Sequence, residues 1–267
     1  MLYKIGDMAR LLGISKEALR LYERRGMIKA IRDEETGYRY YEPLDMTSLI
    51  RCRSYRRYGF TMNETTDLMT TKSLDFVVKK YKEREEALEK SIFWDQKMLE
   101  YLRYIRGVAE TIPTDYMQCR VEQSPPLYRF EYMSGSVLSL TERTWPLFST
   151  WMDKVPFAAL SIVWSLAAML EDRTSVTAGL CIPAEVAVPL EFYLGEPVQY
   201  FPARKCVYTL ASEDRNRFDT PSSFRHVREY MAREGLTPVD DPYCRTFLSW
   251  DKGGNYTRFR QVWTPVG

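Results

Sequence analysis

A run of residues spaced alternately by four and three extends from Leu74 to Ala109, and it constrains the fold more than any other feature of this chain. Eight of its eleven positions are apolar. Three charged residues interrupt it: Glu85, Asp95 and Arg106. This spacing predicts one long helix with a seam suited to a coiled coil, ending before Pro113. At ~1.5 Å per residue the helix would reach about 55 Å, far longer than an ordinary domain helix.

The predicted helix needs a partner for its seam. The chain contains no second long heptad segment, so we expect the helix to pair with a second copy of the chain. A helix folded back on its own chain is the alternative. A second apolar stripe would remain to pack on other parts of the dimer: Trp94, Met98, Tyr101 and Ile105.

Residues 1–41 predict two short helices around a glycine break, followed by a hairpin. The inward positions are Met8, Ala9 and Leu12 in the first helix and Ala18, Leu19 and Tyr22 in the second. Gly13 breaks the chain, and Ser15 can cap the second helix. An apolar run at 27–31, a polar turn at 33–37 and a strand at 38–41 complete the unit.

Charge is distributed unevenly along the chain. Residues 1–60 hold 13 Lys/Arg and 8 Asp/Glu, a net charge of +5. The remaining residues hold 25 and 28, a net charge of −3, so the two parts give the +2 of the whole chain. A positive segment of this kind suits contact with nucleic-acid phosphates, although a solvated basic face is the alternative.

A third helix is expected from the apolar residues Leu44, Leu49 and Ile50, carrying several arginines toward Gly59. Thr61 can cap a short fourth helix.

Six short motifs in this region resemble the winged-helix domain of the MerR family of transcription regulators. They are Ile5-Gly6-Asp7-Met8-Ala9, Gly13-Ile14-Ser15, Ala18-Leu19-Arg20-Leu21-Tyr22-Glu23, Gly26-Met27-Ile28, Gly37-Tyr38-Arg39-Tyr40-Tyr41 and Tyr58-Gly59-Phe60-Thr61. Their order and spacing both fit, and together they cover roughly the first quarter of the chain.

The resemblance implies that the second helix enters the major groove of duplex DNA, with Arg20 contacting a base or the deep groove. Phosphates would be contacted by Tyr22, Tyr38, Arg39 and Tyr41, and the backbone by Arg56 from the third helix. The expected DNA-binding residues are Ser15, Lys16, Arg20, Tyr22, Tyr38, Arg39, Tyr41 and Arg56.

The resemblance also implies a mode of action. Family dimers pair the long helix antiparallel, and they work with RNA polymerase at promoters whose spacer is too long. Effector binding shifts the dimer to a form that bends and untwists this DNA, at a cost that phosphate contacts can offset.

We expect an α+β multidomain chain with four parts: a winged-helix domain at 1–71, a dimerisation helix at 72–112, a proline-containing linker at 113–126 and an α+β effector domain at 127–267. In the last part, strands at 127–132 and 206–210 precede helices at 140–152 and 222–234, which suggests a duplicated strand-helix unit. This layout, with Phe201-Pro202-Ala203-Arg204 and Arg233-Glu234-Gly235-Leu236, resembles the gyrase-inhibitor-like domain that senses drug-like molecules.

The aromatic residues of the effector domain suit a planar or cationic ligand, with ordinary core packing as the alternative. The expected ligand-binding residues are Trp145, Trp164, Tyr208, Tyr243 and Trp250. Trp145 and Tyr208 match positions of pocket aromatics in relatives. Relatives also place a carboxylate after a tyrosine in a strand, and Cys244 stands at the corresponding position here.

Several other functions lack a signal. The five cysteines are scattered and His226 is the single histidine, so we expect neither a metal site nor a catalytic nucleophile–base pair, and no cofactor. The free thiols and the lack of a long apolar run predict a cytoplasmic protein that is not in a membrane. Two rivals stay open: a small-molecule-sequestering protein with a vestigial DNA-binding unit, and a hydrolase, which would need a polar, acid-lined cleft.

Overall fold

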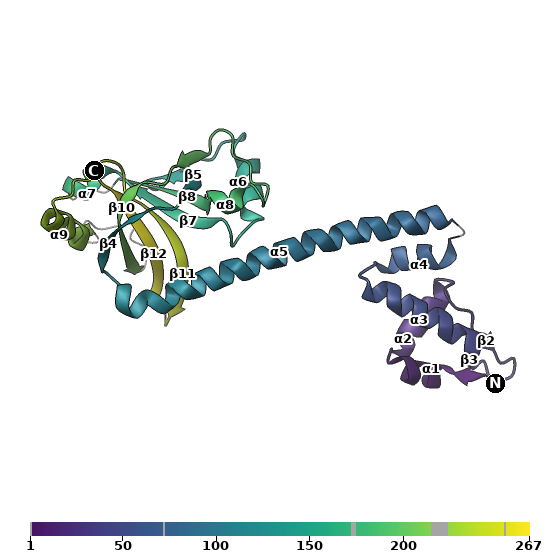
Figure 1. Cartoon of the computed structure of the whole chain (residues 1–267). Helices are drawn as coiled ribbons and strands as arrows, with labels where there is room; N and C mark the ends of the chain where they lie inside the picture. The colour runs from purple at the N-terminus through teal and green to yellow at the C-terminus, as the bar shows by residue number, and fades with distance from the viewer. Residues whose placement is uncertain (1, 72, 172–174, 215–223, 254) are drawn as a thin grey trace. The chain divides into compact units, whose positions relative to one another are not determined.

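The computed structural model describes residues 2–71, 73–171, 175–214, 224–253 and 255–267 (Figure 1). The chain divides into two compact units, Met1–Gln96 and Lys97–Gly267. The long helix contributes residues to both units.

The first unit is a helix-turn-helix joined to a small sheet and two further helices. Its elements are β1 (Tyr3–Lys4), α1 (Ile5–Leu12), α2 (Lys16–Arg24), β2 (Ile31–Arg32), β3 (Arg39–Tyr41), α3 (Pro43–Arg57) and α4 (Met62–Thr70). The sheet is antiparallel, in the order β1-β3-β2.

Local signals fix the ends of these helices. Gly13, with φ +60°, ends α1 in the left-handed conformation that glycine adopts without strain. The hydroxyl of Ser15 accepts a hydrogen bond from the Ala18 amide and caps α2. Thr61 and Glu64 form a reciprocal capping box at the start of α4.

One core holds the first unit together. The buried side chains come from α1, α2, the sheet and α3, and they include Met8, Leu19, Tyr41, Leu49 and Cys52. Because both the hairpin and the helices contribute to this core, the orientation of the hairpin toward α2 is fixed by packing.

The long helix α5 (Leu74–Asp115) spans 42 residues and continues through Pro113, beyond its expected end. Pro113 has no N–H to donate to the carbonyl of Ala109, and the helix continues for only two residues beyond it. The last turns of α5 pack on the second unit through Ile105, Val108 and Ile112.

The second unit contains a nine-stranded antiparallel sheet among the described residues, in the order β4-β10-β12-β11-β7-β8-β5-β6, with β9 paired to β5. Its strands are β4 (Cys119–Gln123), β5 (Leu127–Ser134), β6 (Val137–Leu138), β7 (Ala159–Trp164), β8 (Val176–Pro183), β9 (Gln199–Phe201), β10 (Lys205–Asp214), β11 (Tyr243–Lys252) and β12 (Asn255–Pro265). Its helices, apart from α5, are α6 (Trp145–Met152), α7 (Leu166–Glu171), α8 (Ala184–Ala187) and α9 (Arg225–Glu234).

The two faces of this sheet are covered differently. One face packs on α7 and α9 through a core that includes Trp164, Met169 and Val227. The other face packs on the last turns of α5 through a core that includes Tyr208 and Trp263. Successive side chains of a strand point to opposite faces, so each strand serves both cores.

Two segments differ from the sequence-based expectation. The segment 113–126, expected to be a linker, contains the end of α5 and β4, which pairs with β10 from Lys205 to Thr209. Tyr101 and Ile105, expected to pack outside the seam on other parts of the dimer, pack on the sheet of their own chain, in agreement with that expectation. The expected helix at 140–152 begins at Trp145, and the first two residues of the one expected at 222–234 lie outside the described residues.

Candidate functional site

The first unit presents basic residues along α2. Lys16 and Arg20 are one helical turn apart and both exposed, and the Arg20 guanidinium lies 3.9 Å from Glu17. Ser15 is exposed and also caps the helix. These three expected DNA-binding residues therefore lie together at the N-terminal end of one helix.

The hairpin is joined to α2 by an ion pair. Arg39 Nε donates to Glu23 Oε2 at 2.8 Å, and Arg32 lies 3.7 Å from the other oxygen of that carboxylate. The Arg39 side chain is 30% exposed, so part of its guanidinium stays accessible. Tyr38 is exposed beside it. Arg39 and Tyr38 are thus accessible on the hairpin, and Arg39 already has one partner.

The two remaining tyrosines lie elsewhere than expected. Tyr22 and Tyr41 are buried in the core of the first unit, and burial raises the pKa of both phenols. The Tyr41 hydroxyl has no hydrogen-bond partner among the described residues. In these positions the rings support α2 and the hairpin by packing, which differs from the phosphate contact expected of them.

Three arginines of the first unit donate side-chain hydrogen bonds to backbone carbonyl groups. Arg56 donates to the Phe60 carbonyl at 2.5 Å, and Arg53 donates to the Leu12 carbonyl. Arg84 of α5 donates to the Tyr58 carbonyl. The positive charge counted in the sequence therefore serves partly to fix the turns between the helices.

The five aromatic residues expected to bind ligand do not lie together. Trp145 and Trp250 are exposed, while Trp164, Tyr208 and Tyr243 are buried. Trp164 packs on Phe224 at the α9 face, whereas Tyr208 and Tyr243 flank Trp263 at the α5 face. None of the five lines either of the two cavities described next.

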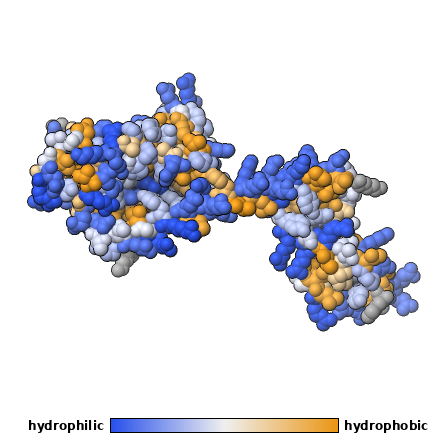
Figure 2. All heavy atoms as spheres, in the orientation of Figure 1, coloured by the Kyte–Doolittle hydropathy of each residue, from blue (hydrophilic) through white to orange (hydrophobic). Residues whose placement is uncertain are grey.

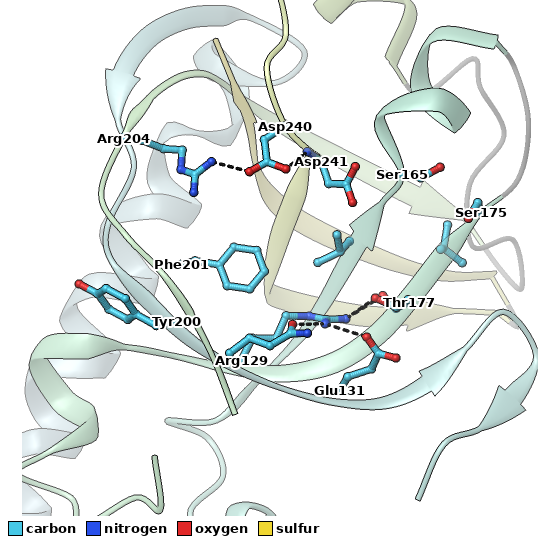
Figure 3. A pocket seen from close by; sticks show the side chains of 13 residues that line it. Arg129, Glu131, Ser165, Ser175, Thr177, Tyr200, Phe201, Arg204, Asp240 and Asp241 are labelled. Carbon is cyan, nitrogen blue, oxygen red and sulfur yellow. Dashed lines mark hydrogen bonds and ion pairs between the residues drawn. The ribbon is translucent and has the colours of Figure 1, made fainter. Parts of the chain in front are cut away.

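The larger of the two cavities described here for the second unit has a volume of about 470 Å³ (Figure 3). It is lined by Arg129, Glu131, Val163, Ser165, Ser175, Val176, Thr177, Gln199, Tyr200, Phe201, Arg204, Asp240 and Asp241. Figure 3 shows Arg129, Glu131 and Thr177 on one side, Asp240 and Asp241 across from them, and the Phe201 ring between.

The charged groups of the larger cavity all have protein partners. The buried Arg129 donates to Thr177 Oγ1 at 2.8 Å and to Glu131 at 3.3 Å, and burial lowers its pKa. Arg204 pairs with Asp240 at 2.6 Å. Asp241 accepts a hydrogen bond from the Leu166 amide at 2.7 Å. The cavity is consequently polar but largely neutralised by its own residues.

The acidic residues of the larger cavity were not among the ligand-binding residues expected from the sequence. Cys244, compared there with a carboxylate of relatives, is buried in the α7 and α9 core, and its sulfur accepts from the Ile162 amide at 3.4 Å. The acids at the cavity are Glu131, Asp240 and Asp241. A signal for Glu131 did exist: Arg129 and Glu131 are two residues apart in an otherwise apolar strand, which places both on one face.

A smaller cavity, of about 160 Å³, is bordered by the C-terminal half of α5, by α8 and by β11 of the sheet. It is lined by Lys97, Glu100, Tyr101, Tyr104, Pro125, Phe157, Pro183, Glu185, Val186 and Arg245. The hydroxyl of Tyr104 donates to Gln261 Oε1 at 2.6 Å, and Gln261 Nε2 donates to the Tyr208 hydroxyl at 3.4 Å. Tyr208 therefore lies behind a cavity residue and is connected to it through Gln261.

The thiols and acids in the described part of the chain offer no cluster for a metal. Within the described ranges, no three His, Cys, Asp or Glu residues are grouped so that they could hold a metal ion. Four of the five cysteines are buried and Cys119 is half-buried. No helix in the described part of the chain has the length and hydropathy needed to cross a bilayer.

We expect the native protein to react slowly with Ellman's reagent at pH 8, with Cys119 modified first. Burial raises the pKa of Cys52 to about 11, which leaves roughly one thiol in a thousand as thiolate at that pH. Cys181, Cys206 and Cys244 are also buried. A time course with and without denaturant measures this, and rapid release of more than one equivalent from the folded protein would contradict it.

Comparison with known proteins agrees with the architecture of the first unit. The family model described as "MerR family regulatory protein" matches residues 4–41. The chain is 36% identical to the mercuric resistance operon regulatory protein of Bacillus cereus over 69 residues, 26% of this chain and 52% of that protein. It thus spans about half the length of that relative.

Two further matches extend beyond the helix-turn-helix. The chain is 30% identical to the HTH-type transcriptional regulator CueR of Salmonella typhi over 117 residues, 42% of this chain and 82% of CueR. A solved structure, the EcmrR-DNA complex in EcmrR-RPo, matches 99% of both chains at 15% identity with a TM-score of 0.34. The identity to CueR over most of its length, together with the matched helix-turn-helix, shows that this chain belongs to the MerR family of regulatory proteins.

Proposed function

We propose that this protein is a dimeric, effector-responsive transcription regulator that binds promoter DNA in the cytoplasm. The observation that carries the proposal is the exposed pair Lys16 and Arg20 on α2 beside the accessible Tyr38 and Arg39 of the hairpin. This arrangement suits a helix in the major groove flanked by phosphate contacts.

In this proposal Arg20 reads base edges, and Ser15 and Lys16 contact the adjacent backbone. Tyr38 and Arg39 form the phosphate-contacting wing, and Arg56 contributes charge from α3. Tyr22 and Tyr41 act by packing, because their buried rings support the two elements that face DNA.

Dimerisation is proposed to occur through α5, paired antiparallel with the helix of a second copy. Seam residues of α5 are exposed in the single chain: Leu74, Val78, Leu88, Ile92, Leu99 and Leu102. Hydrophobic atoms are visible along the surface of this helix (Figure 2). Contiguous exposed apolar surface of this kind is typical of a protein interface.

The second unit is proposed to be a gyrase-inhibitor-like effector domain for a small aromatic or drug-like molecule. Its α+β architecture, its large antiparallel sheet and its cavities of about 470 and 160 Å³ support this assignment. The order of strand then helix occurs twice, as β5 and α6 and as β10 and α9, which supports a duplicated unit.

The proposed mechanism is distortion of an over-long promoter spacer. The ligand would bind one conformation of the dimer more tightly, and that difference in affinity shifts the population toward the form that bends DNA for RNA polymerase. The effector does not need to touch DNA in this mechanism.

Selection from a random-sequence duplex pool tests the proposal, followed by titration of the enriched operator against a scrambled duplex. We expect Arg20→Ala to weaken operator binding by roughly 5- to 150-fold, the value of one good base contact, and to leave scrambled DNA nearly unchanged. Arg39→Ala should weaken both duplexes equally and reduce the slope of log K against log salt by about 1.

The exposed Arg225→Ala on α9 is the matched control and should change neither affinity. Failure to enrich any sequence would contradict the regulator assignment. If Arg20→Ala weakened the affinity for both duplexes equally, the proposal that Arg20 reads base edges would be wrong.

A further inference from the structure

Arg245 of β11 is a buried cation without an acidic partner. Its relative exposure is 3%, and its Nε–H has no hydrogen-bond partner. Among the described residues, no Asp or Glu forms an ion pair with it. The comparably buried Arg129, by contrast, pairs with Glu131 and Thr177. Since an uncompensated charge is costly to bury, Arg245 needs an explanation that Arg129 does not.

The surroundings of Arg245 are aromatic. Its guanidinium carbon lies 5.2 Å from the ring centre of Tyr101 and 5.4 Å from that of Tyr104, both on α5. The Tyr101 ring lies 5.6 Å from that of Phe157. Cation–π contact compensates a guanidinium only in part, because the faces of the rings carry no full charge. The cavity of about 160 Å³ bordered by these residues is therefore aromatic in its walls and cationic at Arg245.

The other charges of this cavity limit the charge of its occupant. Lys97 is paired with Glu100 at 2.8 Å, and Glu185 is exposed. Glu100 and Glu185 are solvent-accessible, whereas Arg245 is buried. Arg245 therefore determines which ligand charge the interior of the cavity prefers. Two acids nearby disfavour a doubly charged anion such as a phosphate monoester. A single negative charge fits this set best.

We propose that the smaller cavity binds a small aromatic carboxylic acid, with Arg245 as the counter-ion of the carboxylate and Tyr101, Tyr104 and Phe157 against the aromatic ring. This inference names the chemistry and the place of the effector, and so it rests on the function proposed above. A planar guanidinium and a carboxylate match each other with two parallel hydrogen bonds, and Arg245 is the one buried cation that lines this cavity.

The larger cavity is less suited to an anion. Its two arginines already pair with Glu131 and Asp240, and Asp241 adds a third carboxylate. A ligand there would meet charges that are already compensated. The two cavities therefore make opposite predictions: an anion for the smaller one, and a neutral or cationic ligand for the larger one.

The site also places the ligand directly on the long helix. Tyr101 and Tyr104 are residues of α5, and the Tyr104 hydroxyl is hydrogen-bonded to Gln261 of β12. A carboxylate that binds Arg245 changes the cation–π contacts through which β11 holds these two rings. Occupancy of the cavity thereby alters the packing of the last turns of α5 on the sheet.

Benzoate, benzamide and benzamidine test the inference, because they share one ring and nearly one shape but carry charges of −1, 0 and +1. We would titrate each into the full-length chain at pH 7 by isothermal calorimetry and follow the melting temperature. Benzoate is expected to bind at least tenfold more tightly than benzamide, and benzamidine not to bind at this site. Benzoate binding that is no tighter than benzamide binding at the site filled by Val186→Trp would overturn the proposal.

Arg245→Met removes the charge while keeping much of the side-chain volume. We expect it to abolish the preference for benzoate over benzamide and to raise the melting temperature of the ligand-free protein, because the unpaired buried charge is gone. Undiminished benzoate binding by this variant would overturn the assignment. Arg204→Gln, in the larger cavity, is the matched control and should keep the full preference for benzoate.

If Arg245→Met fails to fold, a variant that retains Arg245 still tests the site. Val186 lines the same cavity, and Val186→Trp should reduce benzoate affinity at least tenfold by filling the space. Retained affinity in Val186→Trp would place the ligand elsewhere and overturn the proposal. These measurements use no DNA, while selection of an operator uses no benzoate. If benzoate does not bind as expected but an operator is selected, the ligand site is wrong and the regulator role stands. If benzoate binds as expected but no operator is selected, the regulator role is wrong and the ligand site stands.

Discussion

The double substitution Leu88→Asp and Leu99→Asp is expected to convert the protein from a dimer to a monomer. Both leucines occupy seam positions of α5 and are exposed in the single chain, by 40% and 48%. In a paired helix they would be buried, so each aspartate would place an uncompensated charge in an apolar seam, at a cost of several kcal/mol. Two such charges from each chain exceed what a seam interrupted by Glu85, Asp95 and Arg106 can sustain.

Light scattering coupled to size-exclusion chromatography measures the result. The molar mass should fall from that of two chains to that of one. Affinity for the selected operator should fall with it, since one chain presents one reading helix. Lys90→Asp is the matched control: it lies two residues from both Leu88 and Ile92, on the opposite side of the helix, and should leave the mass unchanged. A double variant that remains dimeric would locate the interface outside the α5 seam.

Trp263→Ala is expected to destabilise the second unit by ~3–5 kcal/mol, the usual cost of truncating a buried tryptophan. Trp263 is 1% exposed, and its ring centre lies 5.7 Å from that of Tyr243 and 5.8 Å from that of Tyr208. Its indole N–H donates to Glu122 on β4 at 3.2 Å. The substitution therefore opens a cavity in the α5-side core and removes a hydrogen bond that links β12 to β4 across β10.

The matched variant is Trp145→Ala, at a tryptophan that the sequence suggested as a ligand residue. Trp145 is 58% exposed and packs mainly on Phe148, so its removal should change the free energy of unfolding by only about 0.5 kcal/mol. Urea unfolding followed by circular dichroism compares the two variants. Similar losses from both would show that exposure in the single chain does not describe the environment of Trp145 in solution.

The first unit could be predicted from sequence because its signals are local. Gly13, Ser15 and the pair Thr61 and Glu64 end or begin helices through contacts within a few residues. The heptad spacing likewise predicted α5, apart from its passage through Pro113. Such features depend on backbone chemistry that a neighbouring residue can satisfy, and so they can be read along the chain.

The second unit was harder to predict because its sheet joins distant residues. β4 pairs with a strand more than 80 residues later, and nothing in its own sequence distinguishes that pairing from a linker. The same long-range register decides which aromatic residues are buried and on which face they lie. Arg245 and Tyr101 meet only because β11 and α5 pack together, and spacing along the chain could not reveal this contact.

The ion pair between Glu23 and Arg39 has a consequence for the search along chromosomal DNA. In the free protein the carboxylate occupies one edge of the guanidinium, so a DNA phosphate must displace it to use that edge. This competition lowers the affinity for every duplex by one common factor and leaves the ratio between operator and random sequence unchanged. Lower affinity for random sequence means shorter dwell times at wrong sites. Glu23 would therefore speed the scanning of DNA without contacting a single base.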